Sequence, residues 1–332
     1  MKLATLRNEG RHGRLALVSR DLRRAVWATP IAATLLDAVE RWKEVEAPLA
    51  ARYAELEAGT AKGAFEFDPR QAMAPLPCAP QFLDGSTFAN HGGLIEKAFD
   101  LGITNEYEKY PLVYQGASDD FIGACDDVAL PSESDNLDFE GEIAVIVDEV
   151  PMGTPEQQAG GHVKLLMLVN DVSLRALTAR EMKTGFGWLQ AKPSTSFSPV
   201  AVTPDELGAA WIGGRVQLPL RVFRNNEWFG HPDGREMTFS FPRLIEHCAY
   251  SRRLRAGTIL GSGTVSNQAR SAGSACIAER RAIEMLDEGA AKTPFLKFGE
   301  RVRIEMLDDQ GRSIFGAIDQ RYVASNSGVS GR

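Results

Sequence analysis

The segment from Leu137 to Val147, with the sequence LDFEGEIAVIV, carries the strongest indication of how this chain folds. Side chains of a β-strand alternate between its two faces, and here both faces are apolar along most of the segment. One face carries Leu137, Phe139, Ile143, Val145 and Val147, and the other carries Ala144 and Ile146. This pattern predicts a strand that is buried on both sides, in the interior of a sheet.

Two acidic residues interrupt this apolar segment. Glu140 and Glu142 share a face, and their Cα atoms would lie roughly 6.6 Å apart on a strand. Two carboxylates at the edge of a buried strand repel each other and lose their hydration, unless a cation lies between them. The alternative is an edge strand on which both glutamates are solvated.

Two further carboxylates follow apolar segments elsewhere in the chain. Leu165–Val169 is a continuous apolar run, typical of a central strand, and it ends in Asn170-Asp171. Asp84 comes directly after a proline-rich segment. Together with the two glutamates they would form an oxygen-only site suited to Mg²⁺ or Ca²⁺, with Mn²⁺ as a further candidate. Alternatively, Asp171 is a helix cap.

Other polar residues are weaker candidates. The sequence after Asp171 has helical character, so Asp171, Arg175 and Thr178 would share one helix face, where a guanidinium could bind a substrate carboxylate. An ordinary aspartate–arginine pair explains the same spacing. His91 and Lys192 have chemically useful side chains, but neither stands in a decisive pattern.

The order of apolar segments predicts an α+β, β-rich fold. Regular alternation of strands and helices is missing, which disfavours a doubly wound sheet. We expect a small N-terminal domain at residues 1–72, a catalytic domain at residues 73–325 and a flexible tail at residues 326–332. Strands are predicted at residues 3–6, 15–18, 142–147, 165–169, 216–223, 258–260, 302–306 and 313–318, a helix at 31–56, a turn at 308–311, and a helix-free linker at 69–80.

Composition limits the classes of function. The net charge of −7 argues against a nucleic-acid partner, because phosphate binding needs a clustered basic surface. The four cysteines are widely spaced and include no CxxC pair, which disfavours both a disulfide framework and a zinc site. Apolar runs long enough for a signal peptide or a membrane span are missing. We therefore expect a cytoplasmic protein that acts without a membrane.

Taken together in this order, the motifs resemble the fumarylacetoacetate hydrolase family, over about residues 84–320. They are Asp84 with His91, Tyr114, Glu140-Gly141-Glu142, Asn170-Asp171-Val172-Ser173-Leu174-Arg175, Lys192-Pro193-Ser194, the turn Gly261–Ser266 with Thr264, and Glu279. The resemblance implies a mixed β-sheet and β-roll catalytic domain with a small N-terminal α/β attachment. It also implies a homodimer.

The resemblance implies a role for each of these residues. Asp84, Glu140, Glu142 and Asp171 would bind the cation, which would polarise a carbonyl of a β-diketo acid. His91, held by Glu279, would activate water, and Lys192 would stabilise or protonate the leaving carbanion. The residues that would contact the substrate are Arg175, Tyr114, Thr264, Ser86 and Thr178.

The implied reaction is hydrolysis of a carbon–carbon bond in fumarylacetoacetate or a related acylpyruvate, as in the degradation of tyrosine and other aromatic compounds. Ser86, Thr178 and Asp100 replace a tyrosine, a glutamine and an arginine that read the substrate in fumarylacetoacetases, so the substrate is less well defined than the chemistry. The alternative is an isomerase, hydratase or decarboxylase that acts on a 2-oxo acid at the same site. A protein with a purely structural cation would need neither His91 nor Lys192.

Overall fold

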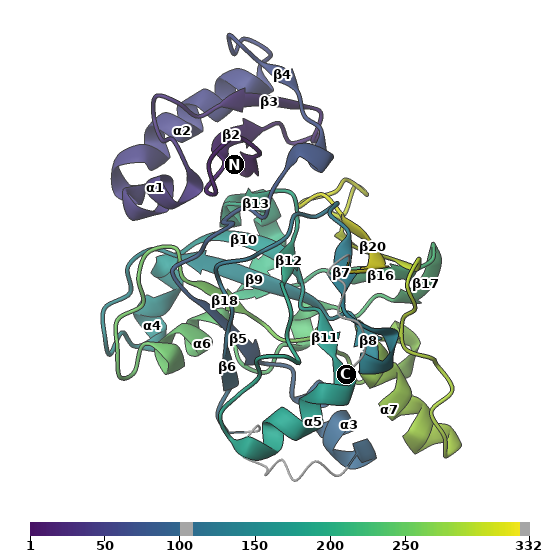
Figure 1. The fold of residues 1–332 in the computed structure, drawn as a ribbon. Coiled ribbons are helices and arrows are strands. Elements are labelled where there is room, and N and C mark those ends of the chain that lie inside the picture. Colours follow the sequence, from purple (N-terminus) through teal and green to yellow (C-terminus); the bar gives the residue numbers. More distant parts are fainter. Residues whose placement is uncertain (100–108, 326–332) are drawn as a thin grey trace.

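The structure, a computed structural model, describes residues 1–99 and 109–325 (Figure 1). Its sheets contain both parallel and antiparallel neighbours, and helices pack against them, which confirms the predicted α+β class. The expected tail at residues 326–332 and Asp100 lie outside the described residues.

The main sheet has eleven strands. In chain order these are β1 (Lys2–Leu6), β2 (Arg14–Val18), β3 (Arg24–Trp27), β4 (Phe65–Glu66), β5 (Phe82–Ser86), β6 (Leu112–Gly116), β9 (Gly141–Val147), β10 (Val163–Asn170), β12 (Ser196–Phe197), β13 (Ala201–Val202) and β18 (Ile259–Gly261). They are hydrogen-bonded in the order β4-β3-β2-β1-β13-β10-β9-β18-β5-β6, with β12 beside β10. Strands β18 and β5 run parallel, which makes the sheet mixed.

The centre of this sheet is the antiparallel pair β9 and β10, as their apolar sequences predict. Val145 lies opposite Leu166 and Ala144 opposite Met167. Val145 and Leu166 belong to one hydrophobic core cluster, whereas Ala144 and Met167 belong to the other. Both faces of the sheet are therefore covered, and this confirms the expected burial of β9 on two sides.

The strand expected from residue 137 to residue 147 is interrupted. Residues 137–138 form a separate strand, β8 (Leu137–Asp138), which pairs with β11 (Ser173–Leu174). The carboxylate of Asp138 turns back and accepts a hydrogen bond from the Phe139 backbone N–H at 2.8 Å. Glu140 consequently lies just before β9, in an isolated bridge to Cys276.

The N-terminal residues extend the main sheet and carry two helices, α1 (Leu35–Glu40) and α2 (Trp42–Glu57), which cover one face of β1–β3 at the top of Figure 1. The single helix predicted at residues 31–56 is wrong in two respects. It begins later, because the Thr34 side chain caps α1, and it breaks at Arg41, whose φ of −112° and ψ of 27° are not helical. Strand β1 pairs with β13, which joins this part to the rest of the sheet.

A second sheet has five strands, ordered β17-β16-β19-β20-β7. They are β7 (Val128–Leu130), β16 (Leu220–Arg224), β17 (Glu227–Gly230), β19 (Arg301–Met306) and β20 (Ile318–Ala324), and a short hairpin joins β14 (Trp211–Ile212) to β15 (Arg215–Val216). The strand predicted at 216–223 is split between β15 and β16, because Pro219 lies between them and cannot donate a backbone hydrogen bond.

The strand predicted at 313–318 is also wrong. Ser313 forms an isolated bridge to Leu307, and Gly316, with a φ of +72°, turns the chain before β20 begins at Ile318. The predicted turn at 308–311 is present, with the Gly311 N–H bonded to the Asp308 carbonyl. The linker at 69–80 contains one 3₁₀ helix, Pro69–Gln71, because Asp68 caps it and proline fits its first turn.

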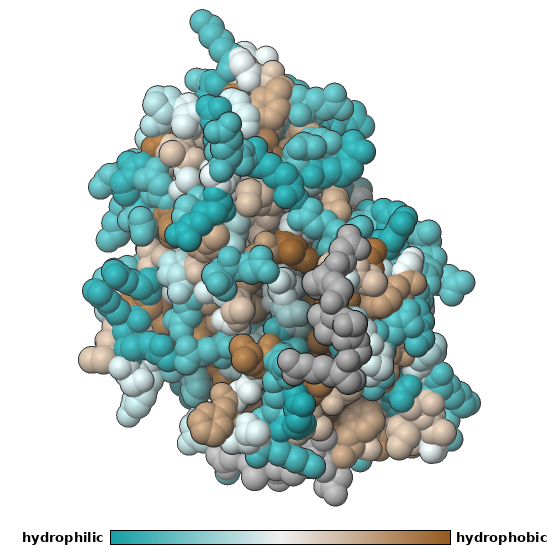
Figure 2. Space-filling model, in the orientation of Figure 1, coloured by the Kyte–Doolittle hydropathy of each residue, from teal (hydrophilic) through white to brown (hydrophobic). Residues whose placement is uncertain are grey.

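Five more helices complete the described chain. They are α3 (Ala89–Phe99), α4 (Glu156–Ala159), α5 (Arg175–Thr184), α6 (Phe241–Cys248) and α7 (Ile277–Glu288). Figure 1 shows α3, α5 and α7 at the end of the main sheet farthest from α1 and α2. None of the helices in the described ranges has the length and apolarity to cross a membrane. Hydrophilic side chains cover much of the face shown in Figure 2.

Glu206 links the N-terminal part to the remainder of the chain. Its side chain is 2% exposed, accepts hydrogen bonds from Arg20 and from the Tyr53 hydroxyl, and lies in the 3₁₀ segment Pro204–Ala210. Burial raises the pKa of Glu206, but Arg20 and the Met1 ammonium, 3.1 Å from Oε1, together outweigh burial and lower the pKa from 4.5 to about 2.

This pKa shift predicts a pH-dependent contribution to stability. A lowered folded-state pKa stabilises the protein above the unfolded value, and the stabilisation is lost as the pH falls from 4.5 towards 2. Because Arg20 is half exposed, we expect Glu206→Gln to lower the free energy of unfolding by about 2 kcal/mol at pH 7. Urea denaturation should show a smaller difference in unfolding free energy between wild type and variant at pH 3 than at pH 7. An equal difference at both pH values would contradict the assignment.

Candidate cation site

Strand register brings three carboxylates together at one end of the main sheet. Asp84 on β5 lies opposite Gly261 on β18, and Gly261 lies opposite Ala144 on β9. Gly261 leaves room between the strands, because a Cβ there would come within 2.1 Å of Asp84 Oδ1 and 3.3 Å of Glu142 Oε2. Glu142 is paired with Val169, so Asp171 emerges beside it where β10 ends.

Asp84, Glu142 and Asp171 therefore form a compact set, which we call the three-carboxylate group. One oxygen of each lies within 4.8 Å of the others, and the three residues are buried. These are three of the four ligands predicted from the sequence. Glu140, the fourth, lies beside them but directs its oxygens to cationic side chains.

Glu142 is the least satisfied of these residues. It is fully buried, and among the described residues neither of its carboxylate oxygens has a hydrogen-bond partner. Burial raises the pKa values of Asp84 and Glu142 well above their ordinary values, and neighbouring carboxylates raise them further. A buried polar atom without a partner is costly, so Glu142 indicates that a positive charge belongs here.

Arg175 and Lys192 hold Glu140 in place. Arg175 donates from Nη2 to Glu140 Oε1, and Lys192 donates from Nζ to Glu140 Oε2 at 2.9 Å. Although burial raises the pKa of Glu140, these two cations outweigh it and hold the pKa well below its usual range. Glu140 is therefore ionised in this arrangement.

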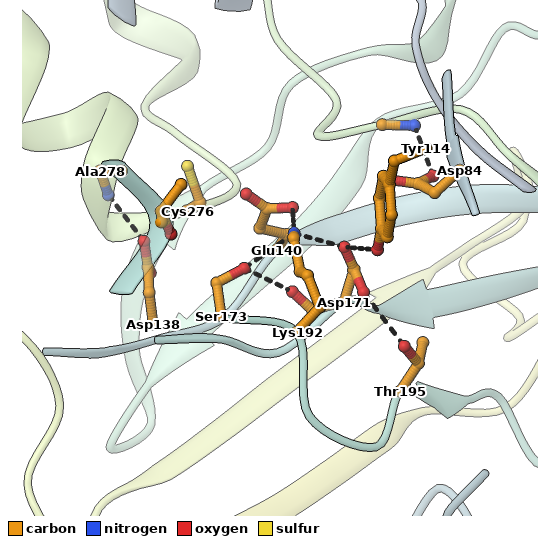
Figure 3. A network of polar contacts seen from close by, with 12 residues as sticks. Asp84, Tyr114, Asp138, Glu140, Asp171, Ser173, Lys192, Thr195, Cys276 and Ala278 are labelled. Carbon is orange, nitrogen blue, oxygen red and sulfur yellow. Dashed lines mark hydrogen bonds and ion pairs between the residues drawn. The ribbon is translucent and has the colours of Figure 1, made fainter. Parts of the chain in front are cut away.

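Lys192 lies at the centre of the polar network in Figure 3. Its ammonium also donates to Asp171 Oδ2 and to the Ser173 hydroxyl at 2.9 Å, and its side chain is 7% exposed. Burial lowers the pKa of Lys192, but the charges of Asp171 and Glu140 together outweigh burial and raise it, so the side chain is cationic. It neutralises part of the negative charge, but no hydrogen bond joins it to Glu142 among the described residues.

The predicted helix face that carries Asp171, Arg175 and Thr178 is not formed. The chain stays extended through Leu174 because Ser173 and Leu174 pair with β8, and α5 begins only at Arg175. Arg175 therefore does not pair with Asp171. Thr178 lies on α5, where its hydroxyl donates to the Leu174 carbonyl at 3.3 Å.

Asp138 is a residue that sequence reasoning missed. Its buried carboxylate accepts hydrogen bonds from Arg175 Nε at 2.8 Å and from the backbone N–H groups of Ile277 and Ala278 at 2.8 and 2.9 Å. It thus joins Arg175 to the N-terminus of α7, where backbone N–H groups favour an anion. Its proximity to Glu140 in sequence was the signal that could have found it.

The Asp138–Arg175–Glu140 arrangement predicts a large stability effect. Arg175→Met would leave the buried Asp138 carboxylate without a cation and Glu140 with Lys192 alone, which should cost about 3 kcal/mol or more of unfolding free energy. Arg221→Met is the matched control, because Arg221 is 42% exposed and lies 3.8 Å from Glu305, so under about 1 kcal/mol is expected. Urea denaturation measures both, and similar small losses would contradict this account.

His91 and Glu279 meet although 188 residues separate them. His91 on α3 and Glu279 in the first turn of α7 are joined by a contact of 2.7 Å between Nδ1 and Oε2. Glu279 is fully buried, whereas the His91 side chain is 15% exposed. A carboxylate on Nδ1 favours the tautomer whose Nε2 can accept a proton.

Aromatic rings cover the network from one side. Tyr114 on β6 donates from its hydroxyl to Asp171 Oδ2 at 2.8 Å, and Trp188 packs against the Tyr114 ring with centroids 5.0 Å apart. Lys192 Nζ lies 5.5 and 5.6 Å from the two ring centroids. Trp188 was not predicted as a site residue, because nothing in its own segment connects it to Tyr114.

Two other predicted site residues lie close to Asp84. Ser86 ends β5 and is half buried. Thr264 is buried in the turn after β18, where the neighbouring Gly263 N–H donates to Asp84 Oδ1 at 3.3 Å. Gly263 has a φ of +74°, and a Cβ there would come within 2.2 Å of the Gly85 carbonyl, so this close approach requires glycine.

The donors fit a divalent cation that prefers oxygen. The three-carboxylate group offers only oxygen, its negative charge exceeds what Lys192 balances, and Glu142 lacks a donor. Mg²⁺, Ca²⁺ and Mn²⁺ favour such ligands. Fold and site together define an α+β protein with a buried carboxylate site beside a histidine–glutamate pair.

The chain belongs to the fumarylacetoacetate hydrolase family. The family model described as Fumarylacetoacetate (FAA) hydrolase C-terminal matches residues 82–322, and Fumarylacetoacetase N-terminal domain 2 matches residues 1–78. This confirms the resemblance inferred from the motifs.

Known relatives are distant and differ in activity. A 2,4-didehydro-3-deoxy-L-rhamnonate hydrolase of a Sphingomonas species is 29% identical over 157 residues, 46% of this chain and 52% of that protein. An oxaloacetate tautomerase of Bacillus subtilis is 26% identical over 196 residues, 59% of this chain and 61% of that protein. Matched segments thus span little more than half of these relatives.

The fold is shared with a solved maleylpyruvate hydrolase of a Sphingobium species, crystallised with manganese(II) and pyruvate. The TM-score is 0.67 at 16% identity, and the match covers 98% of this chain and 100% of that chain. This likeness concerns the fold alone.

Proposed function

We propose that this protein is a divalent-cation-dependent hydrolase that cleaves a carbon–carbon bond in a β-diketo acid, such as an acylpyruvate or fumarylacetoacetate. The observation that carries the proposal is the position of His91, held by Glu279 beside the three-carboxylate group. A purely structural cation site would not need a held histidine. The solved maleylpyruvate hydrolase that shares the fold holds manganese(II) and pyruvate, and the proposal assigns a divalent cation and a 2-oxo acid product to this chain as well.

In this proposal the three-carboxylate group and Glu140 would hold the cation, which would supply Lewis-acid polarisation of a substrate carbonyl and stabilisation of negative charge. Mg²⁺ and Ca²⁺ suit these ligands, and Mn²⁺ is a further candidate. The existing hydrogen bonds to Asp171 from Tyr114 and Thr195 would orient this carboxylate, with Thr195 Oγ1 at 3.0 Å from Oδ1.

The reaction then needs two proton transfers. His91 would take a proton from water as its oxygen attacks the carbonyl, and Glu279 would stabilise the resulting imidazolium. The bond between the acyl carbon and its neighbour breaks, the electron pair stays on the neighbour, and Lys192 would stabilise or protonate that carbon. The products are two acids, and one water is consumed.

Substrate recognition would use the side chains around this centre. Tyr114, Thr264, Ser86 and Thr178 remain our candidates for contacts with substrate oxygens. Arg175 remains a candidate as well, although its Nε and Nη2 already bind Asp138 and Glu140. Trp188 adds an apolar wall beside Tyr114, which would favour an unsaturated or apolar acyl group.

The decisive assay follows the enol absorbance of fumarylacetoacetate and of simpler acylpyruvates, with Mg²⁺ and then with EDTA. Decay that depends on metal and yields two acids supports the hydrolase. Loss of enol absorbance without the two acids would contradict it.

A second candidate is tautomerisation of a 2-oxo acid such as oxaloacetate, which the Bacillus subtilis relative favours. That reaction moves a proton between carbon and oxygen and breaks no carbon–carbon bond. Equilibration of enol and keto oxaloacetate, with acylpyruvates left intact, would select this alternative.

We also propose a cytoplasmic homodimer. Light scattering is expected to give twice the chain mass of 36.2 kDa, as the family resemblance implies. A single-chain mass at micromolar concentration would overturn this expectation.

A further inference from the structure

A second group of metal-binding side chains adjoins the three-carboxylate group. A ring nitrogen of His91, a carboxylate oxygen of Glu140 and the Cys276 sulfur lie within 4.8 Å of one another. Glu140 and Cys276 face each other across a backbone bridge, so the fold itself brings this pair together. Figure 3 shows Cys276 next to Glu140, on the side of Asp138.

The two groups differ in chemistry. Nitrogen, sulfur and oxygen donors favour Zn²⁺, whereas the all-oxygen neighbour favours Mg²⁺, Ca²⁺ or Mn²⁺. We propose that His91, Glu140 and Cys276 form a Zn²⁺ site, and that Zn²⁺ bound there inhibits the enzyme by occupying the histidine that activates water. The inhibition rests on the proposed function, but the binding of Zn²⁺ does not.

The geometry is close to what Zn²⁺ requires. Ligand atoms around tetrahedral Zn²⁺ are roughly 3.5 Å apart, given bond lengths of about 2.0 to 2.3 Å. The three ligand atoms lie within 4.8 Å of one another, so each pair needs to close by at most about 1.3 Å. The His91 side chain is 15% exposed, which gives a route for the ion and for a water as fourth ligand. Glu279 on Nδ1 is the carboxylate partner that metal-binding histidines commonly have.

The neighbouring contacts are compatible with occupancy. Each carboxylate oxygen has two lone pairs, so Glu140 can accept from Arg175 or Lys192 and still bind a metal ion. Cys276 is fully buried, which raises the pKa of its thiol well above the ordinary value, and its sulfur accepts from the Glu279 backbone N–H at 3.3 Å. Binding of Zn²⁺ must therefore displace the thiol proton. The thiol proton would pass to solvent when Zn²⁺ binds.

The test uses the full-length protein saturated with Mg²⁺, so that the oxygen site is filled. Zn²⁺ is titrated by calorimetry, and Co²⁺ serves as a spectroscopic substitute. Wild type should bind one Zn²⁺ and show a thiolate-to-cobalt charge-transfer band. Cys276→Ser, which keeps an oxygen to cap α7, should lose the band and bind Zn²⁺ more than about tenfold more weakly.

Two further variants make the result specific. His91→Ala should weaken Zn²⁺ by a similar factor, and it keeps the test decisive if Cys276→Ser fails to fold. Cys248→Ser, at the end of α6, should leave Zn²⁺ binding unchanged. A retained cobalt band in Cys276→Ser, or equal inhibition of it and of wild type by Zn²⁺, would overturn the proposal.

Failure of the proposed function would look different. If every diketo acid stays intact while the band still depends on Cys276, then the hydrolase proposal fails and the Zn²⁺ site stands. If diketo acids are cleaved but no cobalt band forms, then the Zn²⁺ site proposal fails and the hydrolase proposal stands.

Discussion

Glu142→Gln is expected to weaken the binding of Mg²⁺ or Mn²⁺ at least about 100-fold and to remove most activity, because it deletes one of three buried carboxylates that converge on the cation. The fold should survive. Glu142 is fully buried without a hydrogen-bond partner among the described residues, so a neutral amide relieves repulsion from Asp84 and Asp171. Without added metal, the variant should be at least as stable as wild type.

Thermal unfolding with and without Mg²⁺ distinguishes a loss of metal binding from a loss of stability. A ligand present at 100 times its dissociation constant stabilises a protein by about 2.7 kcal/mol, so added Mg²⁺ should raise the melting temperature of wild type but not of Glu142→Gln. Glu149→Gln is the matched control, since that carboxylate is 55% exposed and should leave the response to Mg²⁺ unchanged. A full response in Glu142→Gln would remove Glu142 from the cation site.

The strands that build this site were predictable because their apolar sequences favour the interior of a sheet. A short run as apolar as Leu165–Val169 is typical of a strand inside a sheet, and the apolar pattern of β9 favours cover on both faces. Carboxylates where such strands begin or end must therefore lie near the edge of the core, which is how Glu142 and Asp171 were found. The pKa values of Glu142 and Asp171 are raised because burial and neighbouring carboxylates both disfavour the charged form.

What the sequence could not show depends on contacts between distant segments. Residues 171–174 have helical character, yet pairing with β8 keeps them extended, because tertiary hydrogen bonds outweigh a weak local preference. Gly261 leaves room for the side chains of Asp84 and Glu142, and this role follows only from the register of β5, β18 and β9. Likewise, the link from Asp138 through Arg175 to Glu140 needs α7 in place.

The contact between His91 and Glu279 is another feature that depends on distant segments of the chain. Neither residue stands in a distinctive local pattern. Their pairing was predicted only from the resemblance to the fumarylacetoacetate hydrolase family. The structure gives that pairing a physical basis, because α3 and α7 pack together and hold Nδ1 against a fully buried carboxylate. The contact indicates how the imidazole is oriented, and activity measurements must show what it does.

His91→Ala is expected to lower kcat for diketo acid hydrolysis about 1,000-fold, since general base catalysis contributes roughly 10² to 10⁴. Binding of Mg²⁺ should be unchanged, because the three-carboxylate group does not include His91. His162→Ala is the matched control: His162 also pairs with a carboxylate, Asp148 at 2.6 Å, but outside the groups that could hold a cation.

The result also separates the two candidate reactions. Hydrolysis needs a base that activates water, whereas tautomerisation needs only proton transfer to and from a substrate carbon, which Lys192 beside Glu140 and Asp171 could assist. Loss of hydrolysis in His91→Ala, with Mg²⁺ affinity retained, would establish His91 as the base. Near-normal turnover would exclude it, and the role of its contact with Glu279 would then be to hold α3 against α7.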